Sequence, residues 1–315
     1  MNLEVVCVGG VAVDRVYRLS NTPQPGSGAH IVETTQRGGG VEANVSAALA
    51  RLGVRVGLIS RVGADADGVW VCDDLRAWGV NTTRVVSVPG VSTDFCLVWV
   101  PPDGERMLAC HNPSLRGMQL DDKDRLCLSQ ARVLFLSGFV PFDLARETML
   151  IARAAGLTVA FDLPDSFDDL AVRGLSRNDF ENLLPQIDLL MTNTVGLTSL
   201  LQVDRSEAAF TAFRRRALES SLVMTMGAEG AWLSRGDEQV FVRAFPVQTV
   251  DTTGAGDAFH AGLIYGLLLE GWSLRRAGLF ASALAALNCT GLGARGGLAD
   301  REEVLQFLLD HGERW

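Results

Sequence analysis

The stretch Asp251-Thr252-Thr253-Gly254-Ala255-Gly256-Asp257-Ala258-Phe259 decides how the rest of this 315-residue chain is interpreted. Residues 245–250 before it predict a strand, and residues 258–270 after it predict a helix. The small residues 254–256 therefore stand where the helix begins. They let a ligand approach the backbone closely, and a helix start offers unpaired N–H groups and a positive dipole end. The stretch thus predicts a seat for a phosphate group.

Asp257 follows this seat in the first turn of the predicted helix. A carboxylate beside a phosphoryl group is well placed to accept the proton of an attacking hydroxyl. The alternative is an ordinary helix start, with glycines for a tight turn and a favourable first-turn charge. A lone Gly-x-Gly-Asp favours that alternative, whereas the full nine-residue string favours catalysis.

Two segments near the N-terminus add candidate binding residues. Residues 3–8 form an apolar run that predicts a buried parallel strand, and Asp14 follows its carboxyl end, where α/β sheets bind ligands. On position alone, a solvated loop aspartate is an equal alternative. The glycines at 38–40 open onto a predicted helix at 41–52, which places the amide of Asn44 in its first turn. The position of Asp14 and the glycine segment before Asn44 are each weak evidence for a binding site, and each strengthens the other.

The remaining chain predicts one α/β domain over residues 1–315 with a small sheet. From residue 121 onward helices and strands alternate, which is typical of a doubly wound parallel sheet flanked by helices. Strand-like residues 15–19 and 30–35 and a hairpin at 93–111, which turns at 101–105, predict antiparallel strands outside the main sheet. We expect the small sheet to comprise two inserts, at about 15–37 and 92–116.

Composition narrows the class of partner and compartment. The net charge of −9 disfavours nucleic acid and anionic membranes. The uncharged run at 277–294 contains polar residues and ends in glycines, so it predicts a buried helix. The start of the chain shows no secretory signal, and the six cysteines contain no Cys-x-x-Cys pair. We expect small buried thiols in a reducing, cytoplasmic compartment. The four histidines lack metal-ligand spacing.

Three separated pieces of the sequence resemble the PfkB carbohydrate kinases, the ribokinase-like family. They are the first strand with Asp14, the segment Gly39-Gly40-Val41-Glu42-Ala43-Asn44, and residues 251–259. The resemblance spans nearly the whole chain in the expected order. It implies an ATP- and Mg²⁺-dependent sugar kinase with a large α/β domain and a small β-sheet lid over the sugar, which often forms a homodimer contact.

The resemblance also assigns roles to matching residues. The implied catalytic set is the base Asp257 with an anion hole from the amides of Gly254, Ala255 and Gly256. The implied sugar-binding set is Asp14, Gly39, Gly40 and Asn44. The implied nucleotide-binding set is Asn193, Thr225, Gly227, Gly230 and Asn288. Asp251 and Thr253 match the positions where relatives hold a monovalent cation such as K⁺.

The chain departs from the family pattern in two places. The family often has Asn-x-x-Glu, linked to magnesium and phosphate handling, where this chain has Asn193-Thr194-Val195-Gly196. Magnesium is still expected, because phosphoryl transfer needs charge neutralisation. The string Phe161-Asp162-Leu163-Pro164 lacks the arginine that follows this aspartate in some subgroups.

The substrate stays open at the level of sequence. The glycine-rich string at 289–297 and the triple glycine are similar to a fructokinase and sulfofructose-kinase branch, yet the lid segments show no basic cluster. Arg37, Arg106 and Arg116 are the candidates to bind an anion, and solvated surface arginines are the alternative. Neutral sugars, sugar acids and nucleosides remain open.

The sequence also bears on three functional classes other than a sugar kinase. A dinucleotide-dependent oxidoreductase is disfavoured because Gly9-Gly10 does not extend to Gly-x-Gly-x-x-Gly. A nucleoside kinase of the same fold is an alternative. A non-catalytic sugar or nucleotide sensor is another, which Gly196 favours and the intact Asp257 opposes.

Overall fold

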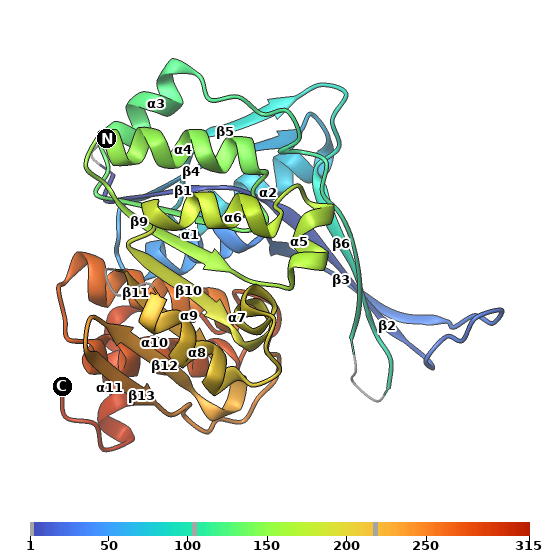
Figure 1. The fold of residues 1–315 in the computed structure, drawn as a ribbon. Helices are drawn as coiled ribbons and strands as arrows, with labels where there is room; N and C mark the ends of the chain where they lie inside the picture. Colours follow the sequence, from blue (N-terminus) through green and yellow to red (C-terminus); the bar gives the residue numbers. More distant parts are fainter. Residues whose placement is uncertain (1–2, 103–105, 217–219) are drawn as a thin grey trace.

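The computed structural model describes residues 3–102, 106–216 and 220–315 and contains two sheets (Figure 1). The large sheet has nine strands in the order β13-β12-β11-β10-β9-β8-β1-β4-β5. Neighbours are parallel except for the pairs β11–β12 and β12–β13. These strands are β1 (Val5–Val8), β4 (Val56–Gly63), β5 (Asn81–Val88), β8 (Val133–Ser137), β9 (Thr158–Leu163), β10 (Leu189–Asn193), β11 (Ser221–Thr225), β12 (Ala231–Arg235) and β13 (Glu238–Val242). The predicted doubly wound parallel sheet is confirmed.

Helices cover both faces of the large sheet because alternate side chains of its buried strands point to opposite faces. In β1, Val5 and Cys7 join one core, while Val6 and Val8 join the other. The first core is covered by α1 (Val41–Arg51), α2 (Ala66–Ala77), α9 (Ala255–Leu263), α10 (Leu274–Asn288) and α11 (Arg301–Asp310). The second is covered by α3 (Asp122–Ser129), α4 (Phe142–Ala154), α5 (Phe167–Val172), α6 (Arg177–Leu183), α7 (Thr194–Leu201) and α8 (Ser206–Arg216).

The second, smaller sheet is here called the lid sheet. It contains four strands in the order β3-β2-β6-β7 and extends away from the large sheet (Figure 1). Its strands are β2 (Ala12–Leu19), β3 (Ile31–Gly39), β6 (Asp94–Val100) and β7 (Met107–His111). The two hairpins are antiparallel as predicted, but the central pair β2–β6 is parallel. The predicted turn at 101–105 lies partly outside the described residues.

Several sequence-based predictions fail in the C-terminal half. Residues 245–250 were expected to form a strand, but they run without strand pairing. Pro246 has no N–H to donate, and residues 245–247 and 249 instead line a cavity. The sequence also yielded no prediction of β12, β13, α5 and α7 or, in the N-terminal half, of β5. Within the described residues no helix is long and apolar enough to cross a membrane, and the uncharged run begins inside α10.

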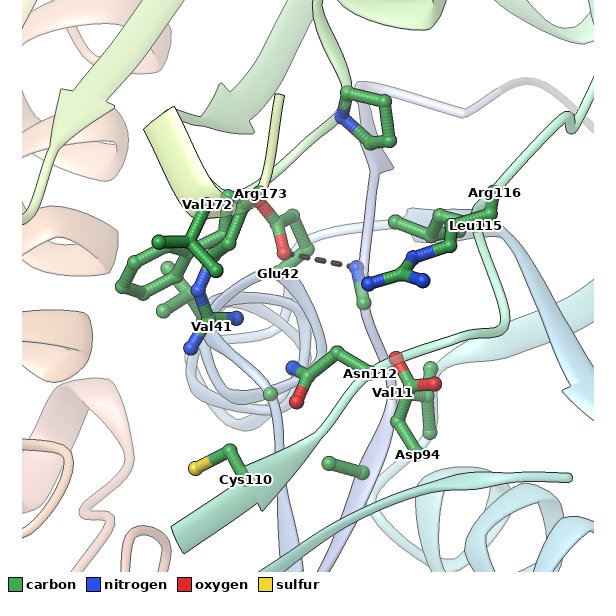
Figure 2. A pocket seen from close by; sticks show the side chains of 15 residues that line it. Val11, Val41, Glu42, Asp94, Cys110, Asn112, Leu115, Arg116, Val172 and Arg173 are labelled. Atoms are coloured by element: carbon green, nitrogen blue, oxygen red, sulfur yellow. Dashed lines mark hydrogen bonds between the residues drawn. The ribbon is translucent and has the colours of Figure 1, made fainter. Parts of the chain in front are cut away.

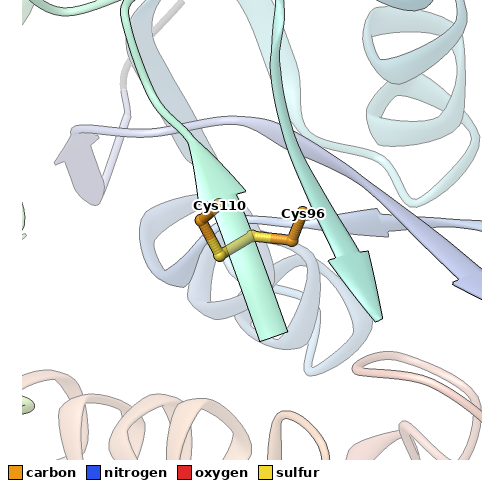
Figure 3. The surroundings of a disulfide bond; sticks show 2 residues. All are labelled: Cys96 and Cys110. Carbon is orange, nitrogen blue, oxygen red and sulfur yellow. A yellow bond between two sulfur atoms is a disulfide. The ribbon is translucent and has the colours of Figure 1, made fainter. Parts of the chain in front are cut away.

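The expectation of six unpaired thiols is wrong for two cysteines. Cys96 of β6 stands opposite Cys110 of β7, with their Cα atoms 4.1 Å apart, and the two form a disulfide (Figure 3). Cross-strand register brings them together, which spacing along the sequence does not reveal. Cys7 and Cys72 are buried thiols as predicted, whereas Cys127 and Cys289 are partly exposed.

Candidate active site

The predicted helix start is confirmed at the nine-residue stretch. Gly254 is the N-cap of α9 and has a φ of +73°, a left-handed conformation that favours glycine. A Cβ atom there would also clash with the backbone of Ala294. The N–H of Ala255 donates to Thr252 O at 3.2 Å, while Gly256 is exposed at the first turn. The loop thus brings a helix N-terminus to the edge of the large sheet.

Asp257 is held by residues from two other parts of the chain. The Asn44 amide donates to Asp257 Oδ2 at 2.7 Å, and Arg295 Nε donates to Asn44 Oδ1 at 2.9 Å. Burial raises the pKa of Asp257 to about 7; the negative charges of Glu42 and Asp14 add to the rise, and the Asn44 hydrogen bond and Arg295 oppose it. A carboxyl with this pKa can take up a proton near neutral pH.

Arg295 is a positioning residue that the sequence analysis quoted only as part of a glycine-rich string. It is buried, and its guanidinium also contacts Asp74 and the carbonyl oxygen of Gly39. A Cβ atom on Gly38 would clash with this guanidinium. The sequence signal was a single arginine among glycines, which is weak without the contact to Asn44.

The predicted sugar-binding residues gather around the same centre. The Asp14 carboxylate of β2 lies against Gly39, where a Cβ atom would clash with it. Burial raises the pKa of Asp14 to about 6, with Asp251 adding to the rise and Arg295 opposing it. Gly40 has a φ of +93° and passes close to the Gly10 carbonyl. The structure therefore brings Asp14, the glycine pair and Asn44 together beside Asp257.

Glu42 is a buried acid to which the sequence analysis gave no role. Its carboxylate accepts the N–H of Gly10 at 2.9 Å and the N–H of Ser137 at 2.8 Å. Burial raises its pKa. The side chain therefore pins the glycine turn after β1 to the end of β8.

Asp162 at the end of β9 is a second buried acid near this centre. Its pKa is raised well above the usual range, first by burial and then by the charges of Asp257 and Glu42. His260 Nδ1 lies 3.8 Å away, but burial lowers the pKa of His260 to about 4, so this ring is neutral at pH 7. Asp162 therefore has no cationic histidine to hold it ionised.

A cavity of about 190 Å³, here called the lid cavity, opens beneath the lid sheet (Figure 2). Backbone of residues 10–12 and 40–42 forms one side, with Glu42 among them. The polar and charged side chains of the opposite walls are Asp94, Asn112, Arg116 and Arg173. Of the three arginines named from sequence, only Arg116 lines this cavity. The sequence did not indicate Arg173, which directly follows α5. It lies on the connection between β9 and β10, the same connection that lacks the arginine found after Asp162 in some subgroups of the family.

A second cavity of about 530 Å³, here called the C-terminal cavity, has the start of α9 in its lining. Thr225, Gly227 and Gly230 line it as predicted for a nucleotide site, together with Ala255 and Gly256. Ala285, Ala286 and Cys289 of the α10 region form another wall. The start of α9 thus belongs to the C-terminal cavity, while the lid cavity is bounded by Gly40, Val41 and Glu42 at the start of α1, the helix that carries Asn44.

Two predicted nucleotide residues do not line this cavity. Asn288 is fully buried and its amide donates to Thr253 O at 3.3 Å and Ala294 O at 3.1 Å, so it braces the loop from behind. Asn193 caps α7, where its Oδ1 accepts the Gly196 N–H at 2.8 Å. A Cβ atom on Gly196 would clash with the Leu163 carbonyl, so the missing family acid has no space here.

The predicted monovalent-cation pair has an arginine beside it. Asp251 Oδ1 accepts Arg106 Nη1 at 2.8 Å and the Thr253 hydroxyl at 2.7 Å, and Oδ2 accepts the Gly293 N–H at 2.9 Å. Burial alone would raise the pKa of Asp251. The hydrogen bonds from Thr253 and Gly293 and the charge of Arg106 outweigh burial, so the pKa of Asp251 lies below its usual value. The Arg106 guanidinium already supplies positive charge to this carboxylate, so the donor set as arranged does not fit an added cation.

Comparison with known proteins identifies the family. Residues 2–301 match the pfkB family carbohydrate kinases. The chain belongs to this family. An ATP-dependent ribose-1-phosphate kinase of Halopiger xanaduensis is 32% identical over 293 residues, which cover 93% of this chain and 94% of the relative. A ribokinase of Haemophilus influenzae is 27% identical over 315 residues, covering 98% and 99%.

Solved structures agree with this assignment. The ribokinase of Arabidopsis thaliana, complexed with ribose and ATP, superposes with a TM-score of 0.85 at 25% identity, covering 98% of this chain and 99% of that one. The chain is therefore a carbohydrate kinase with the ribokinase-like fold. The predicted family and fold are both confirmed.

Proposed function

We propose that this carbohydrate kinase transfers the γ-phosphoryl group of ATP to a hydroxyl of a small sugar, with Asp257 as general base. The observation that carries the proposal is the position of Asp257. Its carboxyl has a pKa raised to about 7, is held by Asn44, and directly follows Ala255 and Gly256, which line the C-terminal cavity.

The transfer follows from the chemistry of these residues. The sugar hydroxyl gives its proton to the Asp257 carboxylate as its oxygen forms a bond to the γ-phosphorus. The bond from that phosphorus to the bridging oxygen breaks, and ADP leaves. The N–H groups at the start of α9 face the phosphoryl oxygens and favour the negative charge there. The lid sheet keeps water from the reacting centre.

Nucleotide binding is supported by the C-terminal cavity and by the relatives. The Halopiger enzyme is named ATP-dependent, and the Arabidopsis structure contains ATP. Magnesium fits as an ion carried mainly by nucleotide phosphates and water, which is its usual arrangement in kinases. Among the described residues no group of three histidine, cysteine or acidic side chains is arranged to hold a metal. The magnesium ion supplies charge neutralisation when bound.

The test is ADP release from Mg-ATP over a panel of ketoses, aldoses, sugar acids, phosphosugars and nucleosides, with Asp257→Asn run in parallel. Because the amide keeps the shape and cannot accept the proton, we expect turnover to fall by about 10²–10⁴-fold. Asp310→Asn, an exposed change on α11, is the matched control and should retain wild-type turnover. Turnover of Asp257→Asn close to wild type would refute the base assignment.

A further inference from the structure

The lid cavity contains two arginines from separate segments. Arg116 follows β7 and is exposed, and Arg173 directly follows α5 and is half-buried. Figure 2 shows the two side chains entering from different sides of the cavity, with Asn112 between them. Neither forms an ion pair or a side-chain hydrogen bond with any residue that the structure describes.

Arg173 is held in place without a counter-ion. Its guanidinium carbon lies 4.2 Å from the centre of the Phe139 ring. Burial lowers its pKa, while Asp165, Asp94 and Glu42 act on it only through space. A half-buried guanidinium has five donors, and leaving them unpaired costs desolvation energy. Stacking on Phe139 fixes the group while its donors stay available to a ligand.

The acids of the same cavity are already bonded to the protein. Both carboxylate oxygens of Glu42 accept backbone N–H groups. Asp94 Oδ1 accepts the Ser114 N–H at 2.8 Å, and burial raises the pKa of Asp94. Elsewhere, Arg84 and Arg153 bond directly to aspartates. The lid cavity is therefore a place where two guanidinium groups face a ligand space without such partners.

We propose that the lid cavity takes a sugar carrying an anionic group, a phosphate, carboxylate or sulfonate, which Arg116 and Arg173 bind. The acceptor hydroxyl of that sugar points away from the arginines, toward the Gly40–Glu42 side of the cavity and the helix α1, whose Asn44 holds Asp257. This inference rests on the proposed kinase function and adds the class of substrate. Guanidinium forks match planar or tetrahedral oxyanions with two hydrogen bonds each. A neutral sugar would leave the half-buried Arg173 guanidinium without a charged partner.

The first test compares catalytic efficiency on matched sugars. The value of kcat/KM is measured for ribose and fructose, their monophosphates, an aldonate and a 6-sulfo sugar, in wild type, Arg116→Gln and Arg173→Gln. We expect wild type to prefer one anionic class, and each change to lower the anionic-to-neutral ratio by about ten- to a hundredfold, because charge-assisted hydrogen bonds are lost. Arg235→Gln, an exposed change on β12, is the matched control.

The second test measures binding without turnover. The thermal shift given by each anionic sugar in the absence of ATP should be present in wild type and Arg235→Gln and reduced in both cavity variants. A wild-type preference for neutral sugars, with the ratio unchanged in both variants, would overturn the inference and leave the kinase standing. If no sugar is phosphorylated by the wild type, the proposed kinase function is overturned. In that case a thermal shift that is present in wild type and lost in the two variants would still support the anion site.

Discussion

The C-terminal cavity and the lid cavity differ in the chemistry of the side chains that line them. The described lining of the C-terminal cavity contains no Asp, Glu, Lys, Arg or His and is rich in glycine, alanine and threonine. The lid cavity is smaller, about 190 Å³ against 530 Å³, and four of its lining side chains are charged types. The first lining offers a ligand mainly backbone groups and small side chains, while the second also offers charged side chains.

The two cavities also differ in how the chain builds them. Most of the C-terminal cavity comes from residues 225–289, where strand ends, a turn and two helices follow one another. The lid cavity collects residues from 10 to 173, which come from the lid sheet, the start of α1, the end of α5 and several loops. A change in one cavity should therefore act on one substrate only.

The substitution expected to have the largest effect on one substrate alone is Ala285→Phe, which should weaken the binding of ATP. Ala285 is partly exposed in the wall of the C-terminal cavity, so the ring would fill space that ATP needs. Overfilling costs about 1–3 kcal/mol, which corresponds to about a ten- to hundredfold rise in the KM for ATP. The KM for the sugar should stay within a few-fold, and Ala285→Ser should leave both values near wild type. Equal rises in both KM values would contradict the separation of the cavities.

A smaller effect is expected where the lid meets the nine-residue stretch. Arg106 lies just before β7 and bonds to Asp251 and to the hydroxyls of Thr252 and Thr253. Because this guanidinium supplies the positive charge, wild-type turnover should change little when KCl is replaced by tetramethylammonium chloride. Arg106→Gln should become activated by K⁺ and lose at most about 1 kcal/mol of stability, as for other partly exposed ion pairs. A strict K⁺ requirement in wild type would contradict this account.

Much of the fold was predictable because buried parallel strands and glycine-flanked helices leave strong local patterns. The start of α9, the lid hairpins and the gathering of Asp14, Asn44 and Asp257 followed from such patterns and from the family resemblance. The strand predicted at 245–250 failed because an apolar run can also line a cavity in extended form. The homodimer contact and the cytoplasmic location stay predictions.

The missed residues share one property, which is that long-range packing gives them their role. Arg295 reaches Asn44 across 251 residues, and Glu42 reaches Ser137 across 95. Arg173 gains its place in the lid cavity from the path of α5. The Cys96–Cys110 disulfide depends on strand register. None of these contacts leaves a periodic or local signal in the sequence.

The most direct test of Asp257 as the base is the pH dependence of kcat/KM in wild type and Asn44→Ala. A base works when deprotonated, so with a pKa of about 7 the rate should rise with pH through neutrality and then level off. Asp14, with a pKa of about 6, shares this limb as a coupled group. The Asn44 hydrogen bond lowers the pKa of Asp257. Its removal in Asn44→Ala should therefore raise that pKa and move the rising limb of the profile to higher pH. A flat profile through neutrality, or an unmoved limb in Asn44→Ala, would contradict the account.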